Sequence, residues 1–203
     1  MMRRTLRRWL TAGTVIVVIG AVFFLPKILG DVLYPIKYET EINAAAAEFN
    51  LEPALLFALV KSESNFRPTI HSHAGAIGLA QLLPSTAAGV ARQLGISNFQ
   101  TSDLYDPALN ARLGAAYLRS LLDKYDQRED LALMGYNGGP GAVNRYLSSG
   151  TLPRETNRYY QVVLDRRDKY AEILAEQATE QQNPEPVEQT TGIKKAFLKW
   201  FNN

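Results

Sequence analysis

The run PALLFALVKSE occupies residues 53–63 and ends an apolar helical segment with a carboxylate. Pro53 suits the first turn of a helix, and the leucines that follow recur at a spacing that places them on one helical face. Glu63 lies four residues after Leu59 and seven after Leu56, so its side chain is expected to point along that buried face. Burial disfavours the charged form of a carboxyl group, which lets a glutamate donate a proton near neutral pH. A glutamate that only caps the helix or pairs with a neighbour near its end is the alternative at this position.

Apolar residues keep this helical spacing along most of the chain, and no alternating run typical of a β-strand interrupts it. The pattern predicts an all-α domain at residues 36–177, preceded by a linker at residues 30–35. A sharp break is expected at Gly138-Gly139-Pro140-Gly141. The expected helices cover residues 38–49, 53–63, 84–94, 107–126, 130–136, 142–148 and 155–177.

The first 29 residues indicate on which side of the cytoplasmic membrane the domain is located. Trp9 to Leu25 are uncharged and mostly apolar, and Ile28 and Leu29 can lengthen this run if Lys27 reaches toward the lipid headgroups. Four arginines precede the run, which favours a single membrane-spanning helix at residues 1–29 with the rest of the chain outside the cytoplasm. A cleaved secretory signal is the alternative. Either interpretation places the domain on the periplasmic or cell-wall side of the cytoplasmic membrane.

The C-terminal region divides into two parts. Residues 178–192 contain almost nothing apolar and are expected to form a flexible linker. Residues 193–203 place apolar side chains on one helical face beside three lysines, so this segment can contact a membrane surface or a protein partner. A frayed basic end is the alternative.

Composition excludes several classes of function. The chain has no cysteine and only two histidines, which removes disulfide scaffolds, thiolate zinc sites and cysteine nucleophiles. We therefore expect no metal and no cofactor. The whole chain has a net charge of +2 because its N-terminus is basic, whereas residues 28–176 have a net charge of −3. Nucleic-acid binding requires a basic face, so no nucleic-acid partner is expected.

Two further segments contain candidate polar groups for a binding cleft. Residues 64–102 contain no acid but include the glycine-rich stretch Gly75-Ala76-Ile77-Gly78-Leu79-Ala80-Gln81, where a single amide stands among apolar residues. Tyr136 and Asn137 precede the predicted break at residues 138–141. Sugar hydroxyl and N-acetyl groups are suitable partners for such amides, although a purely structural turn would use the same glycines.

In this order and spacing, the motifs resemble the catalytic domain of the soluble lytic transglycosylase family, which has a goose-type lysozyme-like fold. The resemblance rests on Glu63-Ser64-Asn65-Phe66, residues 75–81, Asp106-Pro107, residues 136–141, and Glu155-Thr156 with Tyr159. It covers about residues 36–176. The family usually has methionine at the position of Ala80 and alanine at that of Gly138, and these departures bear on subsite preference rather than on the acid.

The resemblance implies an enzyme that cleaves the β-1,4 bond between N-acetylmuramic acid and N-acetylglucosamine in peptidoglycan and leaves a 1,6-anhydromuramic end. It implies Glu63 as the catalytic acid and then base, with Tyr136 donating a hydrogen bond to it. Ser72 and Gln81 would contact substrate near the scissile bond, Asn137 would support the cleft, and Glu155 with Tyr159 would close its far side. A hydrolytic muramidase on the same fold and a non-catalytic peptidoglycan-binding module are the alternatives.

Overall fold

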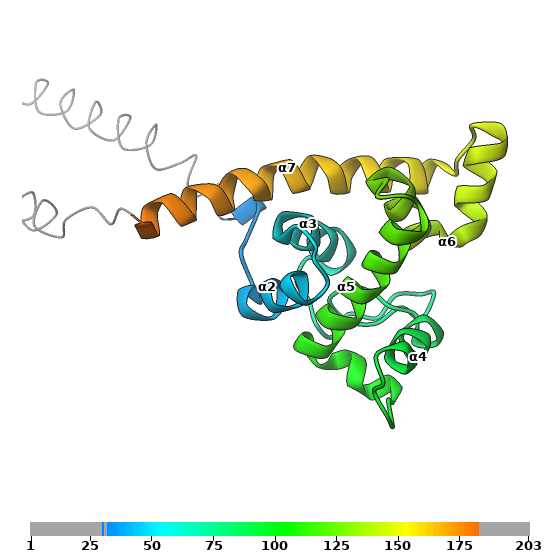
Figure 1. Cartoon of the computed structure of the whole chain (residues 1–203), viewed down its shortest axis with the longest axis horizontal. Coiled ribbons are helices and arrows are strands. Elements are labelled where there is room, and N and C mark those ends of the chain that lie inside the picture. The colour runs from blue at the N-terminus through cyan, green and yellow to red at the C-terminus, as the bar shows by residue number, and fades with distance from the viewer. Residues whose placement is uncertain (1–29, 31, 183–203) are drawn as a thin grey trace, which may run out of the picture.

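The computed structural model describes residues 30 and 32–182, and its helices form an all-α domain (Figure 1). The described part contains isolated β-bridges but no β-strand, which confirms the predicted fold class. In chain order the elements are α2 (Glu39–Glu48), α3 (Pro53–Ser64), α4 (Pro84–Gln93), the 3₁₀ helix η1 (Thr101–Tyr105), α5 (Pro107–Lys124), α6 (Glu129–Ser149) and α7 (Arg154–Gln182).

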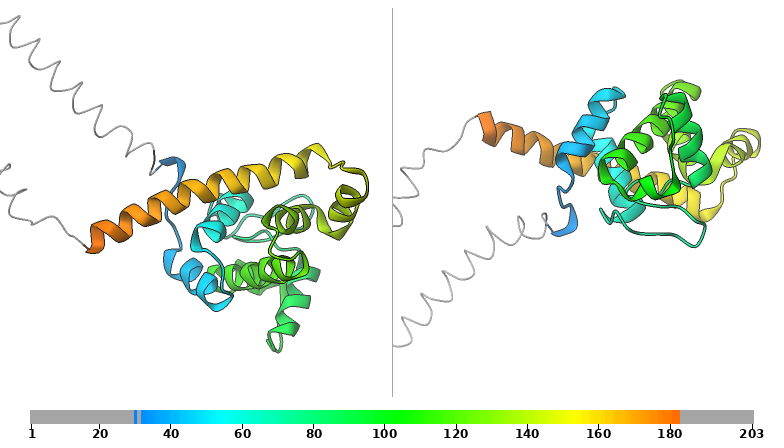
Figure 2. Two further views of the ribbon diagram at one scale, coloured as in Figure 1. Left: turned by 45° about the horizontal axis from the view of Figure 1, so that its top comes forward. Right: turned by 90° about the horizontal axis from the view of Figure 1, so that it is seen from below.

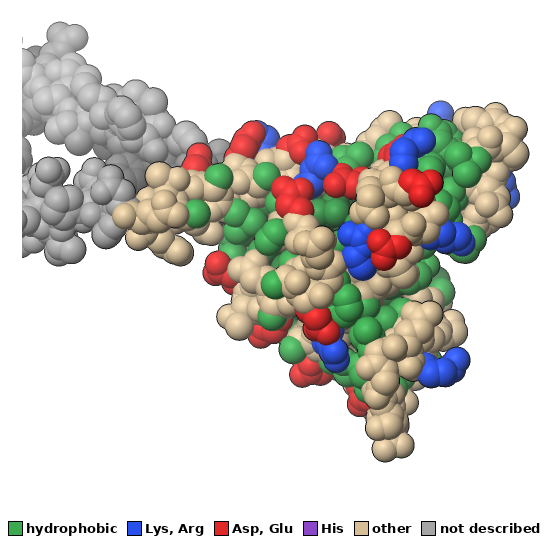
Figure 3. Space-filling model, in the orientation of Figure 1, with side chains coloured by type: hydrophobic (Ala, Val, Ile, Leu, Met, Phe, Trp, Pro, Cys, Tyr) green, Lys and Arg blue, Asp and Glu red, His purple; other side chains and the backbone are tan. Residues whose placement is uncertain are grey.

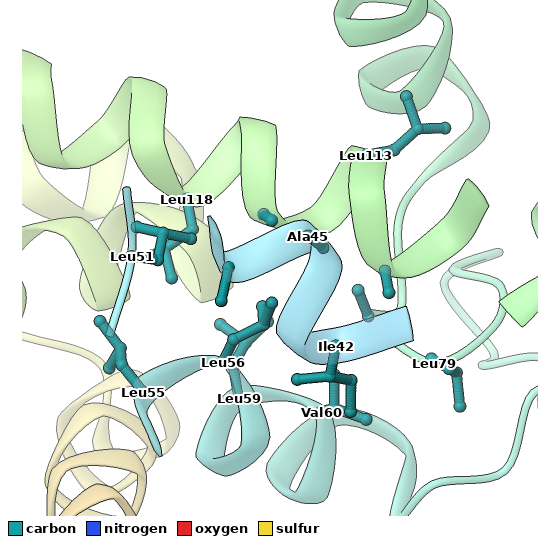
Figure 4. Close-up of a cluster of buried hydrophobic side chains, with 14 of the residues drawn as sticks. Ile42, Ala45, Leu51, Leu55, Leu56, Leu59, Val60, Leu79, Leu113 and Leu118 are labelled. Atoms are coloured by element: carbon teal, nitrogen blue, oxygen red, sulfur yellow. The ribbon is translucent and has the colours of Figure 1, made fainter. Parts of the chain in front are cut away.

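Helix α3 is the centre of the core. Every residue from Ala54 to Val60 is buried, whereas the sequence predicts a single apolar stripe. The difference arises because α3 contacts α2 on one side and the long helix α7 on another. Figure 4 shows Leu56, Leu59 and Val60 of α3 beside Ile42 of α2, with side chains of α5 closing the cluster. A helix that is apolar on all sides belongs in the interior of a protein. Because α3 is packed on several sides, its last turn is held in a fixed position.

Helix α7 lies across α3 and forms one edge of the domain (Figure 2). Its Tyr170 is fully buried and stacks on Phe57 of α3, with ring centroids 5.5 Å apart. The Tyr170 hydroxyl also donates to the Pro35 carbonyl at 3.3 Å. Aromatic contacts of this kind add to the free energy gained from apolar burial. They hold α7 against α3, although the two helices are far apart in sequence.

The loop between α3 and α4 is held in place by one buried amide. Asn110 of α5 is fully buried, and its Oδ1 accepts from the Ala80 backbone N–H at 2.7 Å. Its Nδ2 donates to the carbonyls of Ile77 at 3.0 Å and Leu104 at 2.8 Å. Gly78 has a φ of +84°, and a Cβ there would lie 2.1 Å from Asn110 Nδ2. Only glycine fits at this close approach, because any larger residue would displace the amide.

The helix boundaries follow the sequence closely, with two differences. The predicted break is present within α6, where Gly139 is non-helical at φ 69°, ψ 177°. Helix α7 runs on to Gln182, past the predicted domain end at residue 177. The 3₁₀ helix η1 was not predicted; it begins with a capping box between Gln100 and Asp103.

The predicted membrane anchor at residues 1–29 and the C-terminal segment at residues 193–203 lie outside the described residues, as does the linker from residue 183 onward. Within residues 30 and 32–182, no helix has both the length and the hydrophobicity needed to span a bilayer.

We expect Asn110→Ala to lower the free energy of unfolding by about 3 kcal/mol, because it leaves the Ala80 N–H and the Leu104 carbonyl without partners and removes one of the two hydrogen bonds to the Ile77 carbonyl. Urea unfolding followed by circular dichroism measures the change. Asn144→Ala on exposed α6 surface is the matched control, with an expected effect within roughly 0.5 kcal/mol. Equal stability of the two variants would contradict the proposed role of Asn110.

Candidate active site

Glu63 stands in the last turn of α3, where the chain leaves the core. The backbone turns sharply after it, because Asn65 and Phe66 both adopt positive φ angles, 52° and 58°. Phe66 is 3% exposed and packs beside Phe57, which anchors the turn in the core. The side chain of Glu63 is half-buried. Packing of α3 before the turn and of Phe66 after it fixes the position of Glu63.

Burial raises the pKa of the Glu63 carboxyl to about 7. The Tyr159 hydroxyl of α7 donates a hydrogen bond to Glu63 Oε1, which opposes the effect of burial because it favours the charged form. Burial and the nearby Glu63 raise the pKa of Tyr159 well above its usual value, so the phenol remains a donor. A carboxyl group of this kind exists in both protonation states near neutral pH, as a general acid and base requires.

The predicted hydrogen bond from Tyr136 to Glu63 is not the one that the structure shows. Tyr136 Oη donates instead to the Ala80 carbonyl at 2.8 Å, and Tyr159 bonds to the acid. Gly114 permits this arrangement, since a Cβ at that position would lie 2.4 Å from the Ala80 Cβ. Tyr136 is nevertheless close enough to Glu63 for the carboxylate charge to add to burial in raising the pKa of Tyr136.

Ser72 and Gln81 both hold the loop that precedes α4. Gln81 has a φ of 47°, and its Nε2 donates to the carbonyls of Ile70 at 3.1 Å and Gly78 at 2.9 Å. Ser72 Oγ accepts from the Ala76 N–H at 3.0 Å. Among the described residues, no partner is found for the Gln81 amide oxygen or the Ser72 hydroxyl hydrogen, so both groups can bond to a ligand. Contact with substrate remains a prediction for both residues.

Ala80 is fully buried, beneath the Tyr136 hydroxyl that bonds to its carbonyl. The departure from the family at this position therefore lies under the site rather than on its surface. Asn137 is exposed on α6, two residues before the non-helical Gly139. Among the described residues, no hydrogen bond joins Asn137 to Glu63, so its role in the cleft stays a prediction.

A cavity of about 790 Å³ is lined by Tyr159, whereas Glu63 itself is not among its lining residues. Glu155 lies on its wall one helical turn before Tyr159, as expected for residues four apart on α7. The other lining residues are Ser62, Arg154, Arg158, Val162 and Arg166. The cavity joins the end of α3 to the first half of α7.

Sequence reasoning missed the arginines of this cavity. Arg166 Nη1 donates to Ser62 Oγ at 2.8 Å, across 104 residues of chain. Arg154, Arg158 and Arg166 recur at intervals of four and eight residues on a predicted helix, which places them near one face. That spacing was a usable signal for a basic helical face. Within the described ranges, no three His, Cys, Asp or Glu side chains cluster as a metal would require.

Comparison with known proteins identifies similar domains. Residues 40–156 match the family model for the transglycosylase SLT domain. A transglycosylase of Enterobacteria phage PRD1 is 42% identical over 103 residues, which are 51% of this chain and 35% of the phage protein. Membrane-bound lytic murein transglycosylase C of Klebsiella pneumoniae is 35% identical over 122 residues, which are 56% of this chain and 34% of that protein. The present chain thus spans about a third of the length of these curated relatives.

A solved structure shares the fold. Lytic transglycosylase Slt of Pseudomonas aeruginosa, crystallised as an inactive variant with a glutamate replaced by glutamine, matches with a TM-score of 0.68 and 32% identity. The match covers 71% of this chain and 25% of the Pseudomonas chain. The predicted lysozyme-like helical fold of this family is therefore confirmed for the described residues.

The raised pKa of Glu63 predicts how stability depends on pH. Unfolding lets the carboxyl ionise near its ordinary pKa of 4.5, whereas the folded state holds the proton up to about pH 7. The contribution of Glu63 to the stability of the wild-type chain is therefore lost as pH rises from 4.5 to 7, by up to about 3 kcal/mol, and Glu63→Gln lacks this contribution. Urea unfolding of both proteins at pH 4 to 8 measures this growing difference. Glu155→Gln, at an exposed position of α7, is the control, with an expected effect within roughly 0.5 kcal/mol. Parallel stability curves for the wild type and Glu63→Gln would show that burial does not raise the pKa of this carboxyl.

Proposed function

Because the chain belongs to the transglycosylase SLT domain family, we propose that it is a peptidoglycan lytic transglycosylase. It cleaves the β-1,4 bond between N-acetylmuramic acid and N-acetylglucosamine and leaves a 1,6-anhydromuramic end. The observation that carries the proposal is the Glu63 carboxyl at the end of the buried helix α3, which accepts a hydrogen bond from Tyr159 and whose pKa burial raises to about 7. The inactive glutamate-to-glutamine variant of the Pseudomonas aeruginosa protein supports a glutamate as the reacting group.

In the first step, neutral Glu63 donates its proton to the glycosidic oxygen as the bond to C1 of the muramic sugar breaks. The N-acetyl group of that sugar stabilises the positive charge that develops at C1. Glu63 becomes a carboxylate, and the Tyr159 hydroxyl donates to it in this state. A hydrogen bond to an ionised acceptor is stronger than one to a neutral group, so this contact stabilises the form that the first step produces.

In the second step, the Glu63 carboxylate accepts the proton of the C6 hydroxyl, whose oxygen attacks C1 of the same sugar. The new C6–O–C1 bond closes the anhydro ring and returns Glu63 to its neutral form. No water is consumed, because nucleophile and electrophile belong to one sugar and have a high effective concentration. One carboxyl group thus performs both proton transfers.

The remaining site residues bind and orient the sugars in this proposal. The Gln81 amide oxygen and the Ser72 hydroxyl contact substrate near the scissile bond, from a loop that Asn110 fixes. Tyr136 holds the Ala80 carbonyl and shapes the site next to Glu63, while Asn137 supports the cleft. Glu155 and Tyr159 form the wall on the side of α7.

Hydrolysis by a muramidase mechanism is the second candidate, because Glu155 shares the cavity wall with Tyr159. An inverting or retaining glycosidase needs a second carboxylate to activate water or to act as a nucleophile. Glu155 is the acid on this wall that could serve. Among the described residues, however, only the Tyr159 side chain is hydrogen-bonded to Glu63. A non-catalytic peptidoglycan-binding module would retain the cavity but would not need a Glu63 carboxyl with a raised pKa.

We also propose that residues 1–29 anchor the domain to the cytoplasmic membrane, with the catalytic domain outside it. The charge asymmetry around the apolar run at residues 9–25 supports this orientation. A membrane-bound relative from Klebsiella pneumoniae supports a membrane-proximal role. Cell fractionation followed by protease treatment of spheroplasts tests the topology: the domain should be membrane-associated and protease-sensitive.

Digestion of purified sacculi by the full chain tests the reaction. We expect muropeptides with 1,6-anhydromuramic ends, identified by mass spectrometry, and a loss of roughly 10² to 10⁴ in rate for Glu63→Gln with the fold retained. Glu155→Gln should still release anhydro products, because Glu155 binds sugar without activating water.

Each alternative gives a different result in the same assay. Reducing ends whose formation requires Glu155 would establish the muramidase. Sacculi that bind the chain without releasing muropeptides would establish a binding module. Unfolding of Glu63→Gln, detected by circular dichroism, would show that the glutamate is structural.

A further inference from the structure

We infer that Arg166 is a positioning residue that holds the Tyr159 hydroxyl on Glu63. The inference rests on the proposed function, in which Glu63 carries out both proton transfers, and it adds a residue that acts on Glu63 through Tyr159. The contact that carries it is the hydrogen bond from Arg166 of α7 to Ser62, the residue that directly precedes Glu63 in α3.

Side-chain contacts join α7 to α3 in opposite order along the two helices. In the order of α3, the ring of Phe57 stacks on Tyr170 at 5.5 Å, Ser62 Oγ accepts from Arg166 Nη1 at 2.8 Å, and Glu63 accepts from the Tyr159 hydroxyl. The two helices therefore run antiparallel at these contacts. The hydrogen bond of Arg166 stands next to that of the reacting carboxyl on α3.

The spacing on α7 couples Arg166 to the phenol. Arg166 and Tyr159 are separated by about two helical turns, so their side chains project from nearly the same face of α7. A slip of α7 by one residue along its axis moves both side chains by about 1.5 Å, which is enough to break a hydrogen bond. The stacking of Tyr170 is less directional than a hydrogen bond. Anchoring Arg166 on Ser62 therefore sets where the Tyr159 hydroxyl lies.

Arg166 differs from the other half-buried arginines of the described residues. Each of the others pairs with a carboxylate: Arg112 with Glu48 at 2.7 Å, Arg119 with Asp123 at 2.7 Å, and Arg167 with Glu129. In the space-filling view, basic side chains over α6 and α7 likewise lie beside acidic ones (Figure 3). Within the described ranges, Arg166 bonds to the neutral Ser62 hydroxyl and to no carboxylate. A half-buried cation without a counter-ion is costly, which favours a role in the neighbouring site over a simple surface ion pair.

The charge of Arg166 also reaches the phenol. Burial raises the pKa of Tyr159 well above its usual value, the charge of Glu63 adds to this effect, and the charge of Arg166 opposes it. A cation near a phenol polarises its O–H bond and makes it a stronger donor to a carboxylate. Position and charge of Arg166 thus support the same hydrogen bond.

Other charged and titratable groups surround Arg166 and Glu63. They are Lys61 on α3, Tyr136 on α6, and Arg154, Glu155, Arg158 and Tyr170 on α7. Burial lowers the pKa of Lys61, and the charge of Arg166 adds to this effect. Lys61 Nζ donates to Asn65 Oδ1 at 2.6 Å, so this second cation does not take the place of Arg166 on Ser62. The pKa of Glu63 itself is set by burial and by the Tyr159 hydrogen bond.

The pKa of Glu63 therefore reports on the position of the phenol. The Tyr159 bond favours the carboxylate and lowers the pKa of Glu63 against the effect of burial. Arg166→Gln should weaken this bond and raise the pKa of Glu63 by about 0.5 to 1. ¹³C NMR titration of the Glu63 carboxyl in the full chain measures the change. Arg167→Gln removes the neighbouring cation of α7, which pairs with Glu129, and is the matched control with an unchanged pKa of Glu63.

Two further variants separate the effect of position from that of net charge. Ser62→Ala removes the anchor of Arg166 but keeps its charge, and it should raise the pKa of Glu63 in the same direction by a smaller amount. In a Tyr159→Phe background, Arg166→Gln should cause no additional rise, because the hydrogen bond through which Arg166 acts is already absent.

An unchanged pKa of Glu63 in both Arg166→Gln and Ser62→Ala, with the fold retained by circular dichroism, overturns the inference. An equal rise with and without the Tyr159 hydroxyl also overturns it, since Arg166 would then act on Glu63 directly. Should Arg166→Gln fail to fold, the pKa of Glu63 in Ser62→Ala decides: a rise supports the positioning role, and an unchanged value rejects it.

Turnover of purified sacculi provides the second arm. The first step needs neutral Glu63, so kcat/KM falls as pH rises through the pKa of Glu63. In Arg166→Gln this fall should occur at a pH about 0.5 to 1 higher than in the wild type. A purely structural defect would lower the whole profile without moving its midpoint, and that result would contradict the inference. A raised NMR pKa in a chain that releases no anhydro products supports the positioning role while rejecting the proposed function, so the two failures are distinguishable.

Discussion

The enclosure of one carboxyl group, Glu63, at the end of the central helix is the constraint on which the site depends. Burial makes the charged form of a carboxyl costly, so Glu63 keeps its proton up to about pH 7, beside a tyrosine that lines a cavity. The α3 helix supports it from behind with a run of fully buried residues, and Phe66 fixes the chain just beyond it. Tyr159 supplies a single neutral donor. Burial and this donor act in opposite directions on the pKa, and burial has the larger effect.

Hydrogen bonds and aromatic contacts around Glu63 hold the site in one conformation. Asn110 connects α5 to the loop at residues 77–80, and Tyr136 connects α6 to the carbonyl of the same loop. The stacking of Tyr170 on Phe57 holds α7 against α3, and with it the tyrosine that bonds to Glu63. Each contact joins elements that are distant in the sequence. A substitution far from Glu63, such as one at Asn110, therefore affects the site by moving the loop at residues 77–80 rather than by direct contact with Glu63.

The helices and the acid could be predicted because their signals are local. Apolar periodicity locates the helices within a few residues, and the place of Glu63 at the end of the apolar run indicates its burial. The partner of Glu63 could not be derived in this way, since Tyr159 is 96 residues away and Tyr136 is an equally plausible phenol by sequence. Packing decides between them: the close approach of Gly114 to Ala80 places the Tyr136 hydroxyl on a backbone carbonyl. The cavity arginines gave a periodic signal on α7, but only the fold shows that Ser62 faces them.

The most direct test of the central claim is a ¹³C NMR titration of the Glu63 side-chain carboxyl in the folded wild-type chain, with the resonance assigned by its absence in Glu63→Gln. The structure predicts an apparent pKa of about 7, with the carboxyl largely protonated at pH 6. A pKa near the ordinary value of 4.5 would mean that Glu63 is already charged at neutral pH. The carboxyl would then be unable to start the reaction as an acid, and the proposed role of Glu63 in both proton transfers would be contradicted.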